Sequence, residues 1–290
     1  MYDRILVPTD GSDHASRAAD HAALLAETFD ATVDLVTVVD LDAAAGPFSA
    51  GGVDEGYVEQ LTDSGRETLG DAESRFDRVG TVETAVLTGS PAEAILGHAA
   101  DHDVDLVCMG THGRSGLGRY LTGSVAERVL RQASVPVMTV RATDEGDAAG
   151  YDELLVPTDG SERAEAAVEH ALAIAERFDS RVHVVSVVNV GDIATGSEMG
   201  IPDGLLAELE AGASDATESV ANEARAAGLD AVTSVSVGRP KRDLLAYVED
   251  NDIDLVCMGT HGRTGLNRVL VGSTAEALVR HCTIPVLTVS

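Results

Sequence analysis

Short continuous apolar runs alternate along the chain with segments in which apolar residues recur at helical spacing. In the first half, β-branched and aliphatic runs predict strands at 4–8, 32–39, 82–87, 106–110 and 135–140. Between them, helical spacing predicts helices over 13–29, from 57 to about 79, from 91 onward and over 124–132. Five strands that alternate with four helices are typical of an open parallel sheet with helices on both faces. We therefore predict an α/β fold.

Turn residues mark the ends of several elements. The first strand runs into Thr9-Asp10-Gly11-Ser12, where we expect Ser12 to be the N-cap of the first helix. Gly89-Ser90-Pro91 begins another helix, with proline in its first turn. The stretch 40–56 is too long for a mere connection, so we interpret it as a candidate lid or interaction segment.

The whole pattern occurs twice. Residues 5–12, Ile-Leu-Val-Pro-Thr-Asp-Gly-Ser, return as Leu-Leu-Val-Pro-Thr-Asp-Gly-Ser at 154–161, an offset of 149 residues. A period of this length is a domain and not a solenoid unit. We therefore predict two domains, 1–142 and 151–290, with a linker over 143–150. The strands expected in the second domain lie near 153–157, 181–188, 231–237, 255–259 and 285–289.

A glycine motif follows the fourth strand of each half. Residues 110–113 read Gly-Thr-His-Gly, and Gly-Ser follows after nine further residues. The same pattern begins at 259, and 16 of 20 positions match between 105–124 and 254–273. Glycine lets backbone N–H groups approach phosphate oxygens, and a helix N-terminus adds unpaired donors. The motif therefore predicts an anion site in each half.

Other phosphate-binding motifs are absent from the sequence. The turn after the first strand holds a single glycine, Gly11, and not the three of a Rossmann fingerprint. Lys241 is the sole lysine and follows Arg239-Pro240, so no P-loop is present. In open parallel sheets, ligands bind beyond the carboxyl ends of the strands. Asp10 and Gly110 both lie at that edge, and they converge on one ligand if the first and fourth strands are neighbours.

The charge is strongly negative. A net charge of −29 arises from 49 acidic and 20 basic residues. This field repels nucleic acid and anionic lipid, so we expect neither as a partner. It also repels free ATP, so a nucleotide site must depend on local donors and a metal ion. An acid-rich, lysine-poor composition resembles that of proteins from salt-loaded cytoplasms, although an ordinary acidic cytosolic protein stays an alternative.

The chain has features of a cytoplasmic protein. No apolar run approaches the roughly 20 residues that span a bilayer, and the first residues lack a signal peptide's pattern. Cys108 and Cys257 lie within predicted buried strands, where cysteine behaves as a small apolar residue. A disulfide framework is therefore not expected.

Four motifs together resemble those of the universal stress protein (UspA) family. They are Val-Pro-Thr-Asp-Gly-Ser near the start, Gly-Ser-Pro in the middle, Met-Gly-Thr-His-Gly-Arg with its nine-residue spacer, and the closing Val-Pro-Val. Both halves match, and the glycine pattern is similar to that of the ATP-binding branch. The resemblance implies a Rossmann-like fold of the adenine nucleotide alpha hydrolase type in each half. It also implies that the last strands pair across a two-fold axis, as an internal pseudo-dimer.

The resemblance further implies which residues bind the cofactor, ATP with Mg²⁺. Asp10 would contact the nucleoside, the backbone of Val38 would border the adenine, and the glycine motif would line the ribose and phosphates. In the first half the implied residues are Pro8, Thr9, Asp10, Val38, Met109, Gly110, His112, Gly113, Arg114, Gly123, Ser124 and Val125. In the second half they are Pro157, Thr158, Asp159, Val187, Met258, Gly259, His261, Gly262, Arg263, Gly272, Ser273 and Thr274.

Each of these positions also has an ordinary structural interpretation. Asp10 and its partner in the repeat are also explained as Asx-turn or N-cap residues, and Ser124 as a helix cap. Met109 is also explained as a core residue, and Arg114 either reaches phosphates or faces solvent. For His112 we prefer a structural role, because the sequence shows no second histidine or carboxylate at ligand spacing. We predict neither catalytic nor metal-ligating residues.

The two halves also differ. Gly118 and Tyr120 of the first spacer correspond to asparagine and valine in the second, and Asp40 corresponds to Asn189. Gly-Ser-Pro at 89–91 corresponds to Gly-Arg-Pro at 238–240, which adds a cation near the second site. The two sites therefore need not have equal affinity.

Three hypotheses for the function follow. The first is an ATP-binding stress-response protein with one site per domain, which signals through conformation or choice of protein partner. The second is a slow ATPase or self-phosphorylating enzyme with Ser124 or a neighbouring threonine as acceptor. The third is a dimerisation module that binds no nucleotide. The sequence leaves open the preference among ATP, AMP and cyclic nucleotides, and whether the chain forms a further homodimer.

Overall fold

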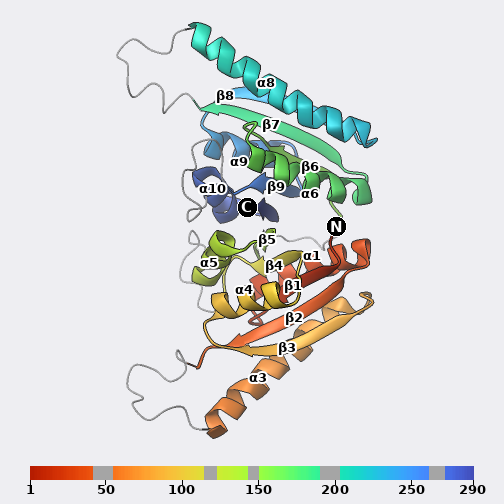
Figure 1. Ribbon diagram of the computed structural model, residues 1–290, viewed down its shortest axis with the longest axis vertical. Coiled ribbons are helices and arrows are strands. Elements are labelled where there is room, and N and C mark those ends of the chain that lie inside the picture. The colour runs from red at the N-terminus through yellow and green to blue at the C-terminus, as the bar shows by residue number, and fades with distance from the viewer. Residues whose placement is uncertain (42–54, 114–122, 143–149, 190–202, 261–271) are drawn as a thin grey trace, which may run out of the picture. The chain divides into compact units, whose positions relative to one another are not determined.

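The computed structural model describes residues 1–41, 55–113, 123–142, 150–189, 203–260 and 272–290 (Figure 1). The chain divides into two compact units, Met1–Ala149 and Gly150–Ser290. Each unit has its own parallel sheet and its own core.

The sheet of the first unit has the strand order β3-β2-β1-β4-β5, and its strand pairs are parallel. Its strands are β1 (Arg4–Pro8), β2 (Thr32–Val39), β3 (Val82–Thr88), β4 (Leu106–Gly110) and β5 (Val137–Val140). The described helices are α1 (Asp13–Phe29), α3 (Glu55–Glu73), the 3₁₀ helix η1 (Ser74–Phe76), α4 (Pro91–Asp101) and α5 (Ser124–Gln132).

The second unit repeats this topology with the order β10-β9-β6-β7-β8. Its strands are β6 (Glu153–Pro157), β7 (Arg181–Asn189), β8 (Ala231–Gly238), β9 (Leu255–Gly259) and β10 (Val286–Val289). Its described helices are α6 (Glu162–Phe178), α8 (Asp203–Ala226), α9 (Pro240–Asp250) and α10 (Ser273–His281). The predicted fold class is thus confirmed.

Most predicted elements match the observed ones, and the differences have local causes. β5 begins at Val137 and not at 135, because Pro136 has no N–H for the ladder and contributes only its carbonyl, which accepts from Val107 N–H at 3.0 Å. The single helix expected to reach 79 is α3 followed by η1. The candidate lid over 40–56 lies almost entirely outside the described residues.

Helices cover both faces of the first sheet. A Cβ built at Gly65 of α3 would lie 3.1 Å from Thr37 Cγ2, so α3 packs on the face of β2 that carries Thr37. Val36 and Val38 point to the opposite face, because side chains alternate along a strand. There they line a cavity together with Pro91 and Ile95 of α4. Strands buried on both faces explain the continuous apolar runs of the sequence.

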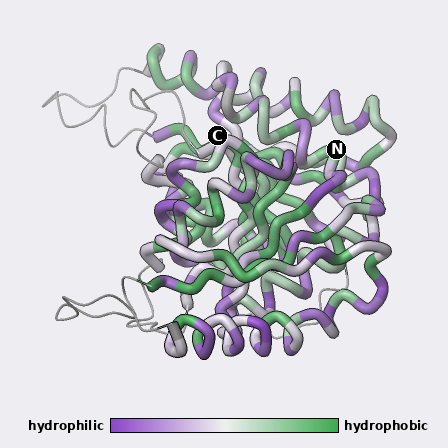
Figure 2. Tube along the Cα trace, turned by 60° about the horizontal axis from the view of Figure 1, so that its bottom comes forward, coloured by the Kyte–Doolittle hydropathy of each residue, from purple (hydrophilic) through white to green (hydrophobic). Residues whose placement is uncertain are grey.

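The core is aliphatic, and α1 packs closely on it. Ile5, Leu6 and Val7 of β1 are fully buried, and Figure 2 shows the hydrophobic strands inside and the hydrophilic segments outside. The face that α1 buries is mostly alanine. These small side chains let the backbone approach β4, where Cys108 Sγ donates to Ala18 O at 3.2 Å. Burial raises the pKa of the Cys108 and Cys257 thiols, so they serve as apolar core residues.

Each unit has one partly buried polar triad at equivalent positions, in which the carboxylate and its basic partner have exchanged strands. In the first unit Asp34, 2% exposed, binds Arg4 Nη1 at 2.5 Å and His98 Nε2 at 2.9 Å. In the second unit the three positions hold Glu153, His183 and Tyr247. His183 Nε2 lies 2.6 Å from Glu153 Oε2, and His183 Nδ1 lies 2.9 Å from Tyr247 Oη. The partners changed together, so that no buried charge is left unpaired.

We predict that Asp34→Ala lowers the free energy of unfolding by about 2–4 kcal/mol, because it leaves Arg4 and His98 without their buried carboxylate. Arg4 also pairs with Glu83 at 3.0 Å, and that side chain is 57% exposed. Glu83→Ala should therefore cost at most about 1 kcal/mol. Urea unfolding of the full chain measures both. Equal losses would show that the buried triad contributes no more than a surface pair.

Candidate functional site

The candidate site lies where the direction of strand order changes in each sheet. β1 pairs with both β2 and β4, so the sheet is built outward on either side of β1. The first and fourth strands are therefore neighbours, which is the condition under which the turn after β1 and the loop after β4 meet. Ligands of open parallel sheets bind at this place.

The turn after β1 is held by its own side chains. Gly11 N–H donates to Thr9 Oγ1 at 3.1 Å, and Ser12 N–H donates to Asp10 Oδ1 at 3.1 Å. Ser12 is the N-cap of α1, as predicted, and accepts from Ala15 N–H. The second unit repeats the same bonds at 158–161. Asp10 and its equivalent therefore form Asx turns, and a contact of Asp10 with a nucleoside stays a prediction.

Two glycines of the motif make close contacts inside the protein. A Cβ on Gly110 would lie 2.7 Å from the carbonyl carbon of His14 and 2.9 Å from Ala15 N, which is closer than side chains pack. A Cβ on Gly113 would lie 2.5 Å from Asp10 Oδ2. The two glycines thus let the loop after β4 lie against the start of α1 and against Asp10.

The N-terminus of α5 has no side-chain cap. Its N-cap is Gly123, and Ser124 is the first helical residue, so the interpretation of Ser124 as a cap is wrong. Gly123 N–H donates to Thr111 O at 2.7 Å, and the helix begins its own hydrogen bonds with Glu127 N–H to Gly123 O at 2.9 Å. The N–H groups of the first turn of a helix have no partner within it. In the second unit Gly272 is likewise the N-cap of α10, without a side-chain hydrogen bond.

These elements enclose a cavity in the first unit with a volume of about 320 Å³. Every predicted residue of this half that the structure describes lines it, and Arg114 lies outside the described residues. The lining residues that were predicted are Pro8, Thr9, Asp10, Val38, Met109, Gly110, His112, Gly113, Gly123, Ser124 and Val125.

The second unit has the equivalent cavity, with a volume of about 500 Å³. His261, Gly262 and Arg263 lie outside the described residues. The other predicted residues all line the cavity, namely Pro157, Thr158, Asp159, Val187, Met258, Gly259, Gly272, Ser273 and Thr274.

Sequence reasoning missed six of the lining residues of each cavity, most of them apolar. In the first unit the missed residues are Ala15, Val36, Pro91, Ile95, Thr111 and Ala126, and in the second each has its equivalent 149 residues on. For two of them the sequence does contain an indication that they line the site. Val36 shares a face of β2 with Val38, and Ile95 lies one helical turn beyond Pro91. The second cavity alone reaches Ser186 and the α8 residues Leu209 and Ala213, for which the sequence gave no indication.

A histidine that the sequence did not indicate lies next to His112. The rings of His14 and His112 are 5.1 Å apart, a proximity that the spacing along the sequence did not indicate. Thr111 Oγ1 lies between them, 3.1 Å from His112 Nδ1 and 3.4 Å from His14 Nδ1. Ala142 N–H also donates to His14 Nδ1 at 3.0 Å, so this nitrogen is an acceptor. Among the described residues, no group of three His, Cys, Asp or Glu could hold a metal ion.

Both histidines are shifted toward the neutral form. Burial lowers the pKa of His14, and the Arg141 cation lowers it further, against the opposing charges of Asp13 and Asp10. Burial also lowers the pKa of His112, with contributions from His14 and Arg141. A neutral His14 is what the hydrogen bond from Ala142 N–H requires.

Comparison with known proteins decides the family. The model of the universal stress protein family matches this chain twice, over residues 1–141 and 150–290. The chain belongs to the universal stress protein family. A universal stress protein of Methanocaldococcus jannaschii is 41% identical over 142 residues, which cover 49% of this chain and 83% of that protein. One from Mycolicibacterium smegmatis is 29% identical over 98% of this chain and 96% of its own length.

A solved structure of the family matches this chain over its whole length. The crystal structure of a universal stress protein from Archaeoglobus fulgidus matches with a TM-score of 0.74 at 22% identity, covering 100% of this chain and 99% of that one. At this identity the likeness establishes the fold. No helix among the described residues is long and apolar enough to cross a membrane.

We predict that Gly110→Ala destabilises the chain by about 1–3 kcal/mol, because the added Cβ would overlap backbone atoms of α1 that cannot rotate away. Gly97→Ala is the control. It lies inside α4 with no atom within 4 Å of the added Cβ, so it should leave stability unchanged or raise it by about 0.5–1 kcal/mol. Urea denaturation measures both. A harmless Gly110→Ala would contradict the close contact between β4 and α1.

We also predict a pH dependence of stability that involves His14. Its pKa is lower in the folded state than in the unfolded state, so the unfolded chain binds the extra proton first as pH falls. The stabilisation is therefore complete above the unfolded pKa of about 6.5 and is lost as pH falls through the folded pKa.

His14→Asn should flatten the stability curve between about pH 7 and pH 5, because an amide oxygen accepts from Ala142 N–H without titrating. Thermal unfolding across this range tests the prediction. His102→Asn, an exposed histidine at the end of α4, is the matched control. A His14→Asn curve as steep as that of the parent would rule out His14 as the titrating group.

Proposed function

We propose that the chain binds ATP with Mg²⁺, at one site in each unit. The observation that supports this most strongly is the meeting of three features at one cavity, the turn after β1, the glycine loop after β4 and the uncapped N-terminus of α5. The same meeting recurs in the second unit with the described equivalents. Cavities of about 300–1,000 Å³ are typical of small-molecule sites.

The residues of the first cavity fit a nucleotide. We propose that the first-turn N–H groups of α5, beginning at Ser124, donate to phosphate oxygens, where the positive end of the helix dipole also favours an anion. The apolar wall of Val36, Val38 and Ile95 suits an adenine ring, and we propose that Asp10, which lines the same cavity, binds the nucleoside hydroxyls. Bound Mg²⁺ would neutralise part of the phosphate charge, and it commonly keeps several waters while it binds phosphates.

The net charge of −29 affects how such a site must work. At low ionic strength the chain's field repels an approaching polyphosphate, whereas concentrated salt shortens the Debye length to about 3 Å at 1 M. Contacts at hydrogen-bond distance survive this screening better than long-range repulsion does. We therefore propose that the protein binds ATP in a salt-rich cytoplasm, and that binding serves regulation and not turnover.

The test places a carboxylate where the phosphates are proposed to bind. Ser124→Asp and Ser273→Asp each add a negative charge at a helix N-terminus, a place that favours acids, so the fold should persist. We expect calorimetric titration of Mg-ATP in concentrated KCl to give two sites for the parent chain, one for each single variant and none for the double variant. The affinity lost at an altered site should be at least about tenfold.

Two controls make this result specific. Ser74→Asp adds the same charge at an exposed residue of η1 that lines neither cavity, and it should leave both sites intact. Ser124→Ala keeps the backbone N–H donors and should lower the affinity for ATP only slightly. ATP binding that survives in the double Asp variant would refute the placement of the phosphates.

Gly113→Val would be a weaker test, because its side chain would also displace Asp10. If the parent chain binds neither ATP nor AMP nor cyclic nucleotides, the result would favour the third hypothesis, a dimerisation module that binds no nucleotide. ADP production that is abolished in a Ser124→Ala, Ser273→Ala variant would favour the enzymatic alternative.

A further inference from the structure

The two cavities differ most at the start of the helix that follows the third strand of each unit. In α4 the residues around Pro91 are Ser90, Ala92 and Glu93. In α9 the equivalent residues around Pro240 are Arg239, Lys241 and Arg242. We name Arg239, Lys241 and Arg242 the cationic rim. It contains the sole lysine of the chain, and 3 of the 20 basic residues fall within four positions.

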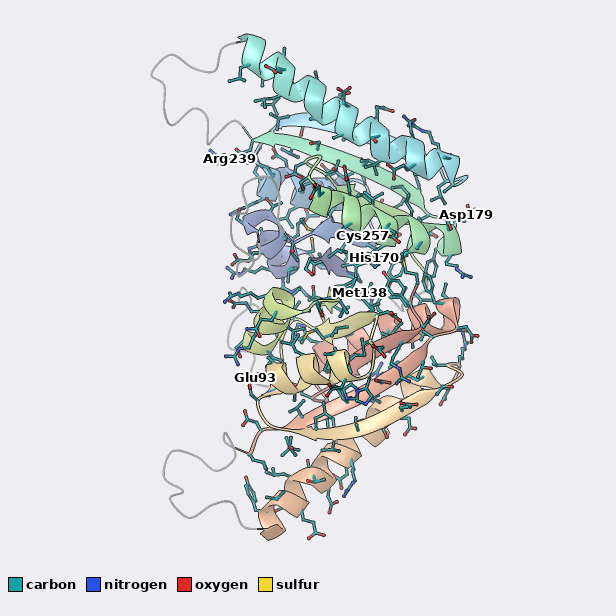
Figure 3. The ribbon with its side chains drawn as sticks, in the orientation of Figure 1. Glu93, Met138, His170, Asp179, Arg239 and Cys257 are labelled. Carbon is teal, nitrogen blue, oxygen red and sulfur yellow. The ribbon has the colours of Figure 1, made fainter. Side chains whose placement is uncertain are left out.

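The rim adjoins the second cavity. Pro240, between Arg239 and Lys241, lines that cavity, as does Leu244 one turn further along α9. The three rim residues are exposed. Figure 3 shows Arg239 and, in the first unit, Glu93 near the starts of their helices. Arginine and lysine side chains at these positions are long enough to extend over the cavity mouth.

The backbone of the rim is fixed by one carboxylate. Asp243 accepts from Arg239 N–H at 2.7 Å and from Arg242 Nε at 2.8 Å. These bonds lower the pKa of Asp243, so it is ionised and offsets one of the three cations. Among the described residues, Arg239 and Lys241 form no ion pair of 4.0 Å or less. The rim together with Asp243 therefore keeps a net positive charge.

The first cavity has no such excess. Glu93 is exposed, and Arg128 of α5 lies 3.8 Å from it and 3.5 Å from Ser90 Oγ. One acid and one base balance there. In the second unit the position of Arg128 is occupied by Ala277. The two mouths thus differ in net charge although the cavities behind them share most of their residues.

We propose that the cationic rim binds the distal phosphates of a polyphosphate nucleotide, so that the second site selects ligands by phosphate number and the first does not. This inference rests on the proposed nucleotide function. The second cavity is also the larger, about 500 Å³ against about 320 Å³, but its additional lining residues belong to β7 and α8, so the proposal rests on the rim and not on the volume. A macromolecular polyanion is disfavoured, because it would meet the repulsion of the whole chain, whereas a small polyphosphate meets mainly the rim.

The experiment compares AMP, ADP, ATP and adenosine 5′-tetraphosphate, each with Mg²⁺, at one site at a time. Ser124→Asp leaves the second site for titration, and Ser273→Asp leaves the first. An exposed charge contributes about fivefold or less to affinity. Two free cations therefore predict that affinity rises from AMP to the tetraphosphate by up to about twenty-five-fold more at the second site than at the first. This extra gain should shrink as KCl is raised.

The matched variants exchange residues between the units. Arg239→Ser with Lys241→Ala introduces the first unit's residues and keeps Arg242 with its partner Asp243. This variant should remove the extra rise in affinity with phosphate number at the second site, while the affinity for AMP stays unchanged. Ser90→Arg with Ala92→Lys should create such a rise in affinity with phosphate number at the first site. Arg66→Ser with Arg78→Ala removes two exposed cations elsewhere and should change nothing.

The possible outcomes are distinct. The rim proposal would be overturned if affinity rose equally with phosphate number at the two sites, or if the extra rise at the second site persisted without Arg239 and Lys241. The proposed nucleotide function would stand in either case. If no nucleotide binds at all, the proposed function fails. Titration with inorganic tripolyphosphate then tests whether the rim binds phosphate groups. Tripolyphosphate binding that Arg239→Ser with Lys241→Ala abolishes would support the rim, and absence of such binding would overturn it.

Discussion

The close contact between the end of β4 and the start of α1 is the constraint on which the site depends. It exists because position 110 has no side chain and because the buried face of α1 is mostly alanine. The contact brings the glycine loop against Asp10, and it brings His14 from α1 beside His112. A bulkier residue at the end of β4 would push the loop after β4 away from the start of α1, and with it the part of the site that this loop contributes.

The duplication shows which parts of this arrangement tolerate change. Both units keep the Asx turn, the glycine N-cap and, of the six cavity-lining positions that sequence reasoning missed, all but one with the same residue. They differ at the helix start beside the cavity mouth, where side chains are exposed and substitution costs little stability. Because the cavity lining is shared and the exposed helix start beside it differs, ligand affinity and selectivity can change between the units while the packing of the core stays the same.

Much of the fold was predictable from the sequence, because buried parallel strands and amphipathic helices have distinct periods. The bounds of β1, β2, β4, α1 and α5 were predicted as observed. The break between α3 and η1 was not, since it falls within a continuous polar pattern. At the site, residues next to a motif were found, whereas His14 was missed, because its proximity to His112 depends on helix packing between positions 98 residues apart.

The exchanged positions of acid and base in the two triads have a consequence for the history of the two halves. Duplicated segments within one gene can recombine and become identical again. An exchange that carried β1 of one unit beside β2 of the other would place Arg4 against His183, or Glu153 against Asp34, and neither pair would join a base to an acid. The folding cost of such a hybrid acts as a barrier to re-homogenisation, so each half is free to acquire a ligand preference of its own.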